Sequence, residues 1–178
     1  FPDRHTTASY DVVECTVAST VKEIAPYSFA STGVTDVNLP SGLETIGDRA
    51  FYNATKLVDI TIPDSVKTIG TGAFKNCSKM TKATLPEGLE TIPRECFIGC
   101  RKLESVNIPD SVTTIGNMAF TGCALKEINI SKNLTEISIP GYTFSGCPAA
   151  ITVDAANPNY SADERGVLYN KDKSLLLH

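Results

Sequence analysis

The six cysteines have the widest range of possible chemistry in this sequence. A thiolate can act as a nucleophile, bind zinc or form a disulfide, depending on its partners and its pKa. Partner residues for nucleophilic catalysis and for zinc binding are missing. The chain has no Cys-x-x-Cys pair, and its two histidines, His5 and His178, lie at the ends of the sequence. We therefore expect neither a zinc site nor Cys-His or Ser-His catalysis.

Other catalytic and ligand-binding motifs are also missing. No glycine-rich phosphate loop follows a predicted strand, and the adjacent acids Asp163 and Glu164, which could ligate calcium, are expected to form a solvated loop. A net charge of −4 argues against nucleic acid as a partner. Apolar stretches are far shorter than the roughly 20 residues of a membrane-spanning helix. The sequence predicts no enzyme, no cofactor, no metal and no membrane insertion.

Phenylalanine spacing reveals an internal repeat. Six Phe residues follow one another at intervals of 22, 23, 23, 23 and 24 residues: Phe29, Phe51, Phe74, Phe97, Phe120 and Phe144. The stretch IPDSVKTIGTGAF (62–74) returns two units later as IPDSVTTIGNMAF (108–120). Because so short a unit cannot enclose a core, neighbouring units must stack and bury their apolar residues against one another. We predict that the six rings form an interior ladder.

Each unit also contains a short segment with the alternation of a β-strand. These segments end at a Pro or Ser and cover residues 34–40, 57–63, 80–86, 103–109 and 125–131. Alternation places polar side chains outward in two columns. The first column is Asn38, Thr61, Thr84, Asn107 and Asn129, and the second is Asp36, Asp59, Lys82, Ser105 and Glu127. We interpret the columns as candidate binding residues; alternatively, short polar residues only keep the sheet face soluble.

Four of the cysteines share one column of the repeat, three residues after Phe: Cys77, Cys100, Cys123 and Cys147. Because Ala54 occupies the same column, the position requires a small side chain, and we expect buried thiols that pack as small hydrophobes. A disulfide between stacked coils is the main alternative, and a metal is a more remote one. A further column holds Gly47, Gly70 and Gly116. These glycines suit a corner, although Pro93 in the same column indicates that a positive φ is not compulsory.

The string L-x-x-V-x-I-P-x-x-V-x-x-I-x-x-x-A-F-x-x-C, clearest from Leu103 to Cys123, resembles the BspA-like class of leucine-rich repeats. The resemblance implies a β-rich repeat solenoid, a right-handed coil of about six units with a parallel sheet on its concave face. It divides a single continuous domain into an N-terminal segment or partial cap (1–16), the solenoid (17–153) and a C-terminal module (154–178). We expect that module to be truncated.

The resemblance also implies a function. Such repeats suggest a secreted or cell-surface protein that adheres to host or neighbouring-cell macromolecules, with a protein or glycoprotein as ligand. The alternative is a structural spacer or stalk segment without a ligand of its own. If the polar columns bind, replacing Asn107 and Thr84 with Lys should abolish binding and leave the thermal stability nearly unchanged.

Overall fold

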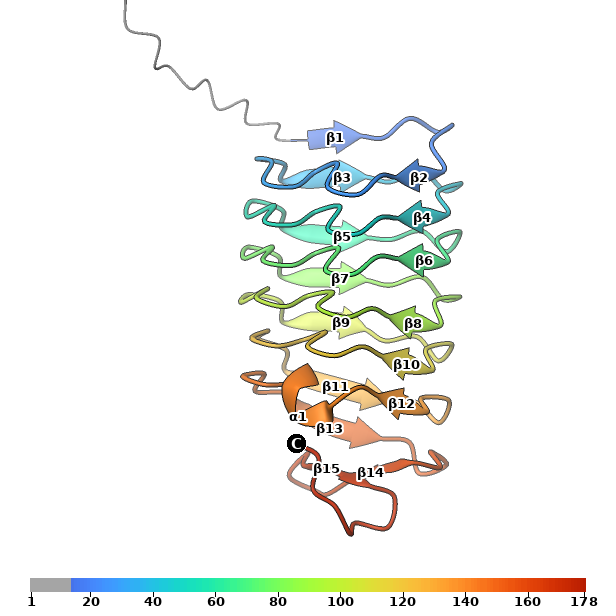
Figure 1. Ribbon diagram of the computed structural model, residues 1–178, viewed down its shortest axis with the longest axis vertical. Helices are drawn as coiled ribbons and strands as arrows, with labels where there is room; N and C mark the ends of the chain where they lie inside the picture. The colour runs from blue at the N-terminus through green and yellow to red at the C-terminus, as the bar shows by residue number, and fades with distance from the viewer. Residues whose placement is uncertain (1–13) are drawn as a thin grey trace, which may run out of the picture.

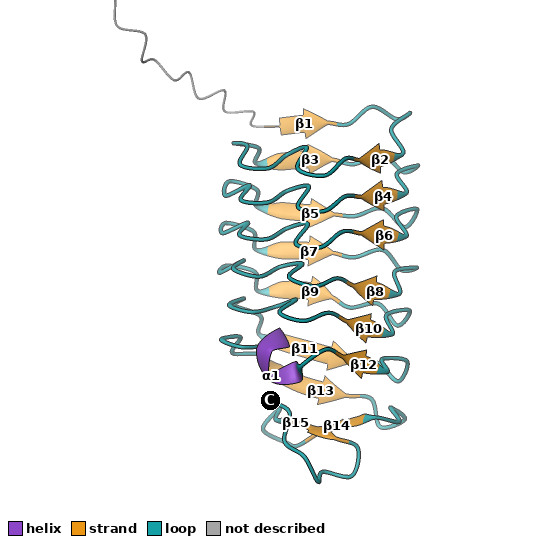
Figure 2. Cartoon of the chain, in the orientation of Figure 1, coloured by secondary structure: helices purple, strands orange, loops and turns teal. Residues whose placement is uncertain are grey.

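A computed structural model of the chain describes residues 14–178 and is a β-solenoid whose coils stack along one axis, as Figure 1 shows. The predicted N-terminal segment lies largely outside the described residues, and His5 lies wholly outside them. Each coil contributes a longer strand and a two-residue strand, joined by turns and loops (Figure 2). Residues 14–178 contain no helix with the length and apolar character needed to cross a bilayer.

The odd-numbered strands form one side of the solenoid, which we call the strand face. They are β1 (Glu14–Thr16), β3 (Asp36–Asn38), β5 (Asp59–Thr61), β7 (Lys82–Thr84), β9 (Ser105–Asn107), β11 (Glu127–Ile130) and β13 (Ala150–Val153). They pair in parallel as β1–β3, β5–β7–β9 and β11–β13. Parallel pairing brings the same column of each repeat into register, so neighbours in the sheet are equivalent residues of successive coils.

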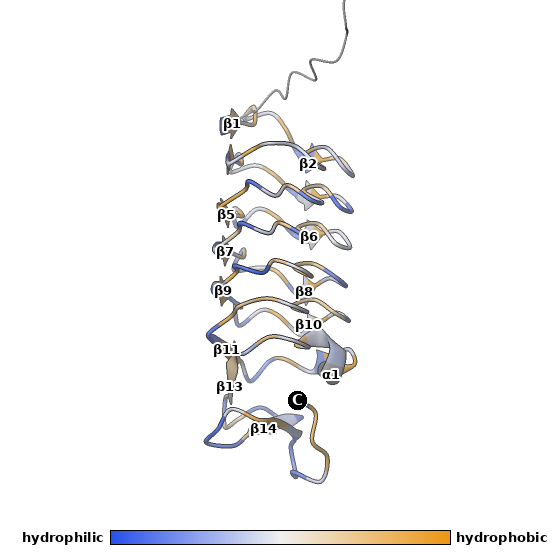
Figure 3. Ribbon diagram, turned by 90° about the vertical axis from the view of Figure 1, so that its left-hand side faces the viewer, coloured by the Kyte–Doolittle hydropathy of each residue, from blue (hydrophilic) through white to orange (hydrophobic). Residues whose placement is uncertain are grey.

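The even-numbered strands lie on the opposite side, which we call the turn face (Figure 3). They are β2 (Glu23–Ile24), β4 (Thr45–Ile46), β6 (Thr68–Ile69), β8 (Thr91–Ile92), β10 (Thr114–Ile115) and β12 (Glu136–Ile137). They form two parallel sheets, β2–β4–β6 and β8–β10–β12. In the sixth unit, the inserted residues Ser138 and Ile139 lead into α1 (Pro140–Thr143), a single helical turn that replaces the turn of the other coils.

The six phenylalanines stack ring on ring through the interior. Successive ring centroids are 4.9, 5.2, 5.4, 5.7 and 6.0 Å apart, and neighbouring planes differ by only 2–10°. The rings from Phe51 onward are fully buried. Ile46 and Leu43 and their equivalents surround the ladder, so the core is one continuous column of repeated apolar residues.

The cysteine column has a bonding role besides packing. The thiols of Cys77, Cys100 and Cys123 each donate a hydrogen bond to the carbonyl oxygen of the phenylalanine in the preceding coil, over 3.1, 3.1 and 3.2 Å. The six cysteines are free, as the packing interpretation expects. The column therefore requires a small side chain, and Cys additionally links coil to coil.

Two backbone positions in each of the first five coils lie in the left-handed region, two residues before Phe and two residues after it, and the sixth coil keeps the second of them. The first set is Tyr27, Arg49, Gly72, Glu95 and Met118, and the second is Ser31, Asn53, Asn76, Gly99, Gly122 and Gly146. In the third coil, the amides of Gly72, Phe74 and Asn76 all donate to carbonyls of the next coil, over 2.9, 3.0 and 2.8 Å. The left-handed residues thus orient every second amide of the turn parallel to the solenoid axis. Successive turns are therefore joined by backbone hydrogen bonds, as successive strands are.

The glycines expected at a corner are needed for a different reason. Gly116 lies outside the left-handed region, but a Cβ there would lie 2.4 Å from the backbone nitrogen of Arg94 in the preceding coil. A Cβ at Gly70 would lie at the same distance from the backbone nitrogen of Asp48. These glycines are explained by the close approach of two backbones and not by their φ angles.

The C-terminal module covers the last coil with side chains that take the place of a further backbone. It contains an antiparallel hairpin of β14 (Tyr160–Ala162) and β15 (Leu168–Asn170). Buried Asn157 donates to the carbonyls of Ser131 and Leu134, over 2.8 and 2.9 Å. The amide of Ile137 in β12 donates to the hydroxyl of Tyr160 at 2.9 Å.

The two kinds of glycine predict different costs of substitution. Gly116→Ala should destabilise the protein by about 3 kcal/mol, because the new methyl group overlaps the backbone of the preceding coil. Gly122→Ala should cost only about 1 kcal/mol, because Gly122 has a φ of +71° but no heavy atom within 4 Å of an added Cβ. Urea unfolding followed by circular dichroism measures both. Equal losses would contradict the close-approach explanation.

Candidate functional site

The candidate binding residues lie together on the strand face, where they form what we call the strand-face strip. Parallel register places Asp59, Lys82 and Ser105 side by side on β5, β7 and β9. It likewise aligns Thr61, Thr84 and Asn107. The members on β3 and β11 are Asp36, Asn38, Glu127 and Asn129. The ten residues therefore form two adjacent rows that run along the solenoid axis.

The strip is exposed because its residues alternate with buried ones along each strand. Val37, Ile60, Ala83 and Ile128 point inward and are nearly inaccessible. Nine of the ten strip residues are exposed, and Thr84 is half-buried. The alternation that the sequence predicts thus determines which side chains solvent can reach.

Shallow hollows occur along the strip. One of about 320 Å³ is lined by residues that include Asp36, Asn38, Asp59 and Thr61. A second, of about 420 Å³, is lined by Ser105, Glu127 and Asn129 together with Glu104 and Lys126. A third, of about 340 Å³, includes Asn129, Asp110 and Asp154. Both polar and apolar side chains line these shallow hollows, and their charged members are mostly acidic, which suits contact with a large partner better than enclosure of a small molecule.

Asn107 differs from Asn38, Asp59 and Asn129 because its side-chain amide is bonded to the protein backbone. Its Oδ1 accepts a hydrogen bond from the backbone amide of Leu85 at 2.8 Å, and its Nδ2 donates to the Leu85 carbonyl at 3.4 Å. These contacts argue against the expectation that a change at Asn107 leaves stability unaltered, because its removal deprives a backbone amide of its partner.

Three other strip residues, Asp59, Asn38 and Asn129, are bonded to neighbouring side chains. The Thr81 hydroxyl donates to Asp59 at 2.7 Å, and the Asn38 amide donates to Glu14 at 3.3 Å. Thr152 donates to the Oδ1 of Asn129. Such contacts order the side chains within the strip while leaving them at the surface.

The strip is longer than the sequence suggests. Glu14 and Thr16 on β1 pair with Asp36 and Asn38, and Thr152 on β13 pairs with Asn129; all three of these additional residues are exposed. The segment ECTV (14–17) has the same alternation as DVNL (36–39), and this signal could have identified the first strand. The strand face of residues 14–178 thus carries seven strands.

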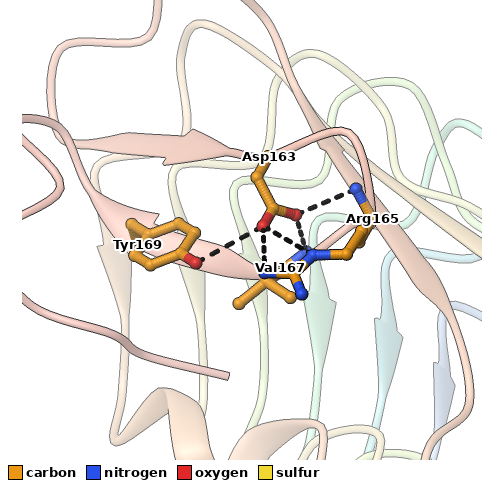
Figure 4. A network of polar contacts seen from close by, with 4 residues as sticks. All are labelled: Asp163, Arg165, Val167 and Tyr169. Atoms are coloured by element: carbon orange, nitrogen blue, oxygen red, sulfur yellow. Dashed lines mark hydrogen bonds and ion pairs between the residues drawn. The ribbon is translucent and has the colours of Figure 1, made fainter.

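The Asp163 loop, expected to be solvated, contains an organised carboxylate, shown in Figure 4. Its Oδ1 accepts hydrogen bonds from the backbone amides of Arg165 and Val167, over 2.9 and 3.0 Å. Its Oδ2 accepts from the Arg165 guanidinium and from the Tyr169 hydroxyl. The hydrogen bond from the Val167 amide is the main cause that holds the pKa of Asp163 below its usual value, and Arg165 contributes to the same effect. The carboxylate closes the hairpin loop.

Four of the cysteines are poorly suited to nucleophilic or metal-binding chemistry. Burial raises the pKa of Cys96 and Cys100 well above the usual value, and it raises those of Cys123 and Cys147 as well. These thiols are therefore protonated at neutral pH and are poor nucleophiles and ligands. Among the residues that the structure describes, no three His, Cys, Asp or Glu side chains are grouped so that they could hold a metal ion.

Stacked parallel coils, a phenylalanine ladder and a polar strand face define a leucine-rich repeat solenoid. The chain belongs to the BspA-type leucine-rich repeat family, whose model matches residues 15–153 in six copies. A leucine-rich cell surface protein from Faecalibacterium prausnitzii has a similar structure, with 31% sequence identity over 89% of this chain and a TM-score of 0.67. The family and the fold are those of repeat modules for protein interaction, which are typically non-catalytic.

Two further solved structures are similar. A leucine-rich repeat protein from Eubacterium ventriosum is 28% identical over 88% of this chain, with a TM-score of 0.67. The pneumococcal vaccine antigen PcpA covers 100% of this chain at 23% identity and a TM-score of 0.59, which shows a common fold alone. The chain spans 51%, 47% and 39% of these three proteins in the order given. No curated protein matches it.

The two roles found within the strip can be separated by substitution. Asn107→Ala should lower the free energy of unfolding by about 1–2 kcal/mol, because the backbone amide of buried Leu85 loses its acceptor. Ser105→Ala on the same strand is the matched control and should stay within about 0.5 kcal/mol. Chemical denaturation measures the difference, and equal stabilities of the two variants would refute the role of Asn107.

The Asp163 carboxylate predicts a local dependence on pH. Because its pKa is lower in the folded protein than in an unfolded chain, it stabilises the hairpin above about pH 4 and loses this effect as the pH falls through the folded pKa. Amide-exchange protection of Val167 should therefore fall below that pH. Asp163→Asn should remove the pH dependence, whereas Glu164→Gln, a change in the neighbouring acid, should retain it.

Proposed function

We propose that the chain is a non-catalytic interaction module of a secreted or cell-surface protein and that it mediates adhesion through the strand-face strip. The observation that carries this proposal is the strip itself, two exposed polar rows that strand pairing keeps in register on β5, β7 and β9 and that the equivalent positions on β3 and β11 extend. The similar protein from Faecalibacterium prausnitzii, described as a cell surface protein, supports the proposed location.

The chemistry of the strip favours a protein or glycoprotein ligand. Asn, Thr and Ser side chains both donate and accept hydrogen bonds, and Asp36, Asp59 and Glu127 add acceptors. Residues of equivalent coils repeat at the spacing of parallel strands, about 4.8 Å. An extended ligand can therefore form many similar polar contacts along the axis, each of them weak.

The stacked core supports a second candidate function, that of a structural spacer. The continuous ring ladder and the hydrogen bonds between turns make the coils a single rigid rod. The match covers only 51% of the similar surface protein, so a segment of this kind can be one part of a longer array. A spacer needs no ligand, and the polar strip would then serve solubility alone.

Binding to intact cultured epithelial cells distinguishes adhesion from the spacer role. Fluorescently labelled chain should bind in a saturable manner, and the double variant Thr61→Lys with Ser105→Lys should bind roughly tenfold more weakly, because two bulky cations are placed on the strip. Neither side chain anchors the backbone as Asn107 does, so the fold should be retained.

The matched control places the same substituent on the other side of the solenoid. Thr68 and Thr91 are exposed on β6 and β8, and Thr68→Lys with Thr91→Lys should leave binding unchanged at closely similar net charge. If the unaltered chain does not bind cells, the spacer role is favoured. If both double variants bind equally, the strand-face strip is not the adhesive surface.

A further inference from the structure

A cluster of aromatic and cationic side chains lies on the turn face, away from the strand-face strip. Tyr27, Arg49, Tyr52 and Lys75, which we call the turn-face cluster, come from three successive coils and line a hollow of about 310 Å³. Tyr27 and Arg49 each lie two residues before the Phe of their repeat. Tyr142 has the same position in the sixth unit and belongs to α1, and Figure 3 places α1 on the side opposite the odd-numbered strands β1 to β13. The cluster goes beyond the proposed function, since it forms a second surface.

Arg49 and Tyr27 order each other at the surface. The Arg49 guanidinium donates to the Tyr27 hydroxyl at 2.7 Å, and its central carbon lies 5.9 Å from the centroid of the Tyr27 ring. Tyr27 is 50% exposed. A guanidinium has five N–H donors, and this bond uses one of them, so the side chain is held in place and can still donate to a ligand.

The turn face is locally cationic in a chain of negative net charge. Lys75 donates to Glu95 at 2.8 Å, and Arg94 lies 2.9 Å from the other oxygen of the same carboxylate. Counted against Glu95 and the exposed Asp48, which precedes Arg49, the three cations Arg49, Lys75 and Arg94 leave a formal surplus of one positive charge. The whole chain has a net charge of −4. The turn-face cluster therefore attracts anions that the acidic strand-face strip repels.

The hydrogen-bonding groups of the hollow favour a carboxylate over a sugar. Arg49 and Lys75 only donate, and among the lining side chains only the two phenol oxygens can accept. Sugar hydroxyls need acceptors, but the nearby carboxylate of Glu95 is already paired with Lys75 and Arg94. A Glu side chain needs donors for its carboxylate and an apolar surface for its methylenes, and the cluster offers both.

We propose that the turn-face cluster is a second interaction surface, which binds an acidic segment of a protein partner. Arg49 receives a carboxylate of the partner, and the rings of Tyr27 and Tyr52 pack against its stem. Tyr and Arg are the residue types most enriched among the side chains that dominate binding at protein interfaces. The surface is independent of the strand-face strip because the two lie on opposite sides of the solenoid.

Fluorescence anisotropy with a labelled oligo-glutamate peptide tests the proposal. The unaltered chain should bind this peptide in a saturable manner that weakens with added salt, and it should not bind an oligo-glutamine peptide of equal length. Arg49→Gly should weaken binding roughly tenfold. This substitution preserves the fold because Arg49 has a φ of 51° and Gly72 already occupies the equivalent position in the next coil.

The control Met118→Gly makes the same backbone change in the same column, at a φ of 59° and without removing a charge, and it should bind as the unaltered chain does. Lys82→Ala, which removes a cation from the strand face, should also bind normally. The proposal is overturned if the unaltered chain fails to bind oligo-glutamate, or if Arg49→Gly binds as well as Met118→Gly. It is equally overturned if a sialylated or sulfated oligosaccharide binds the cluster more tightly than the peptide does.

Discussion

The structure depends on one constraint, that each coil must lie a single strand spacing from the next along the whole axis. That distance, about 4.8 Å, is close to the stacking distance of aromatic rings, so one phenylalanine per coil can fill the interior without interruption. The same distance forbids a Cβ at Gly116 and admits only a small side chain in the column of Cys100. Side chains that point outward are free of this constraint, and there the coils differ.

The sequence predicts the parts of the fold that repeat. The phenylalanine interval and the alternation of the strands give the solenoid, the buried ladder and the exposed rows, because stacking in register is the one way for such short units to bury their apolar residues. The left-handed turns are harder to predict, since non-glycine residues such as Arg49 and Met118 occupy them as readily as Gly72 does.

Individual side-chain contacts within a column could not be predicted. Asn38, Asn107 and Asn129 share one column, yet their contacts differ. Asn107 bonds to the backbone of the preceding coil, and Asn38 bonds to a side chain of the preceding coil. The turn-face cluster was missed for a similar reason. Its tyrosines and cations belong to different columns and coils, so no periodic pattern joins them, and only the folded turns bring them around one hollow.

The cap formed by Asn157 and Tyr160 has a consequence for how the coils are counted. Units as alike as 62–74 and 108–120 could slip by one repeat and still form nearly the same internal contacts. The bonds from Asn157 to Ser131 and Leu134, and from Ile137 to Tyr160, join residues 23 to 26 positions apart and tie the cap to the coil that precedes it in the sequence. A stack that slipped at this end would separate these partners and leave buried Asn157 without its acceptors, so the cap favours the register in which the sixth coil is the last one.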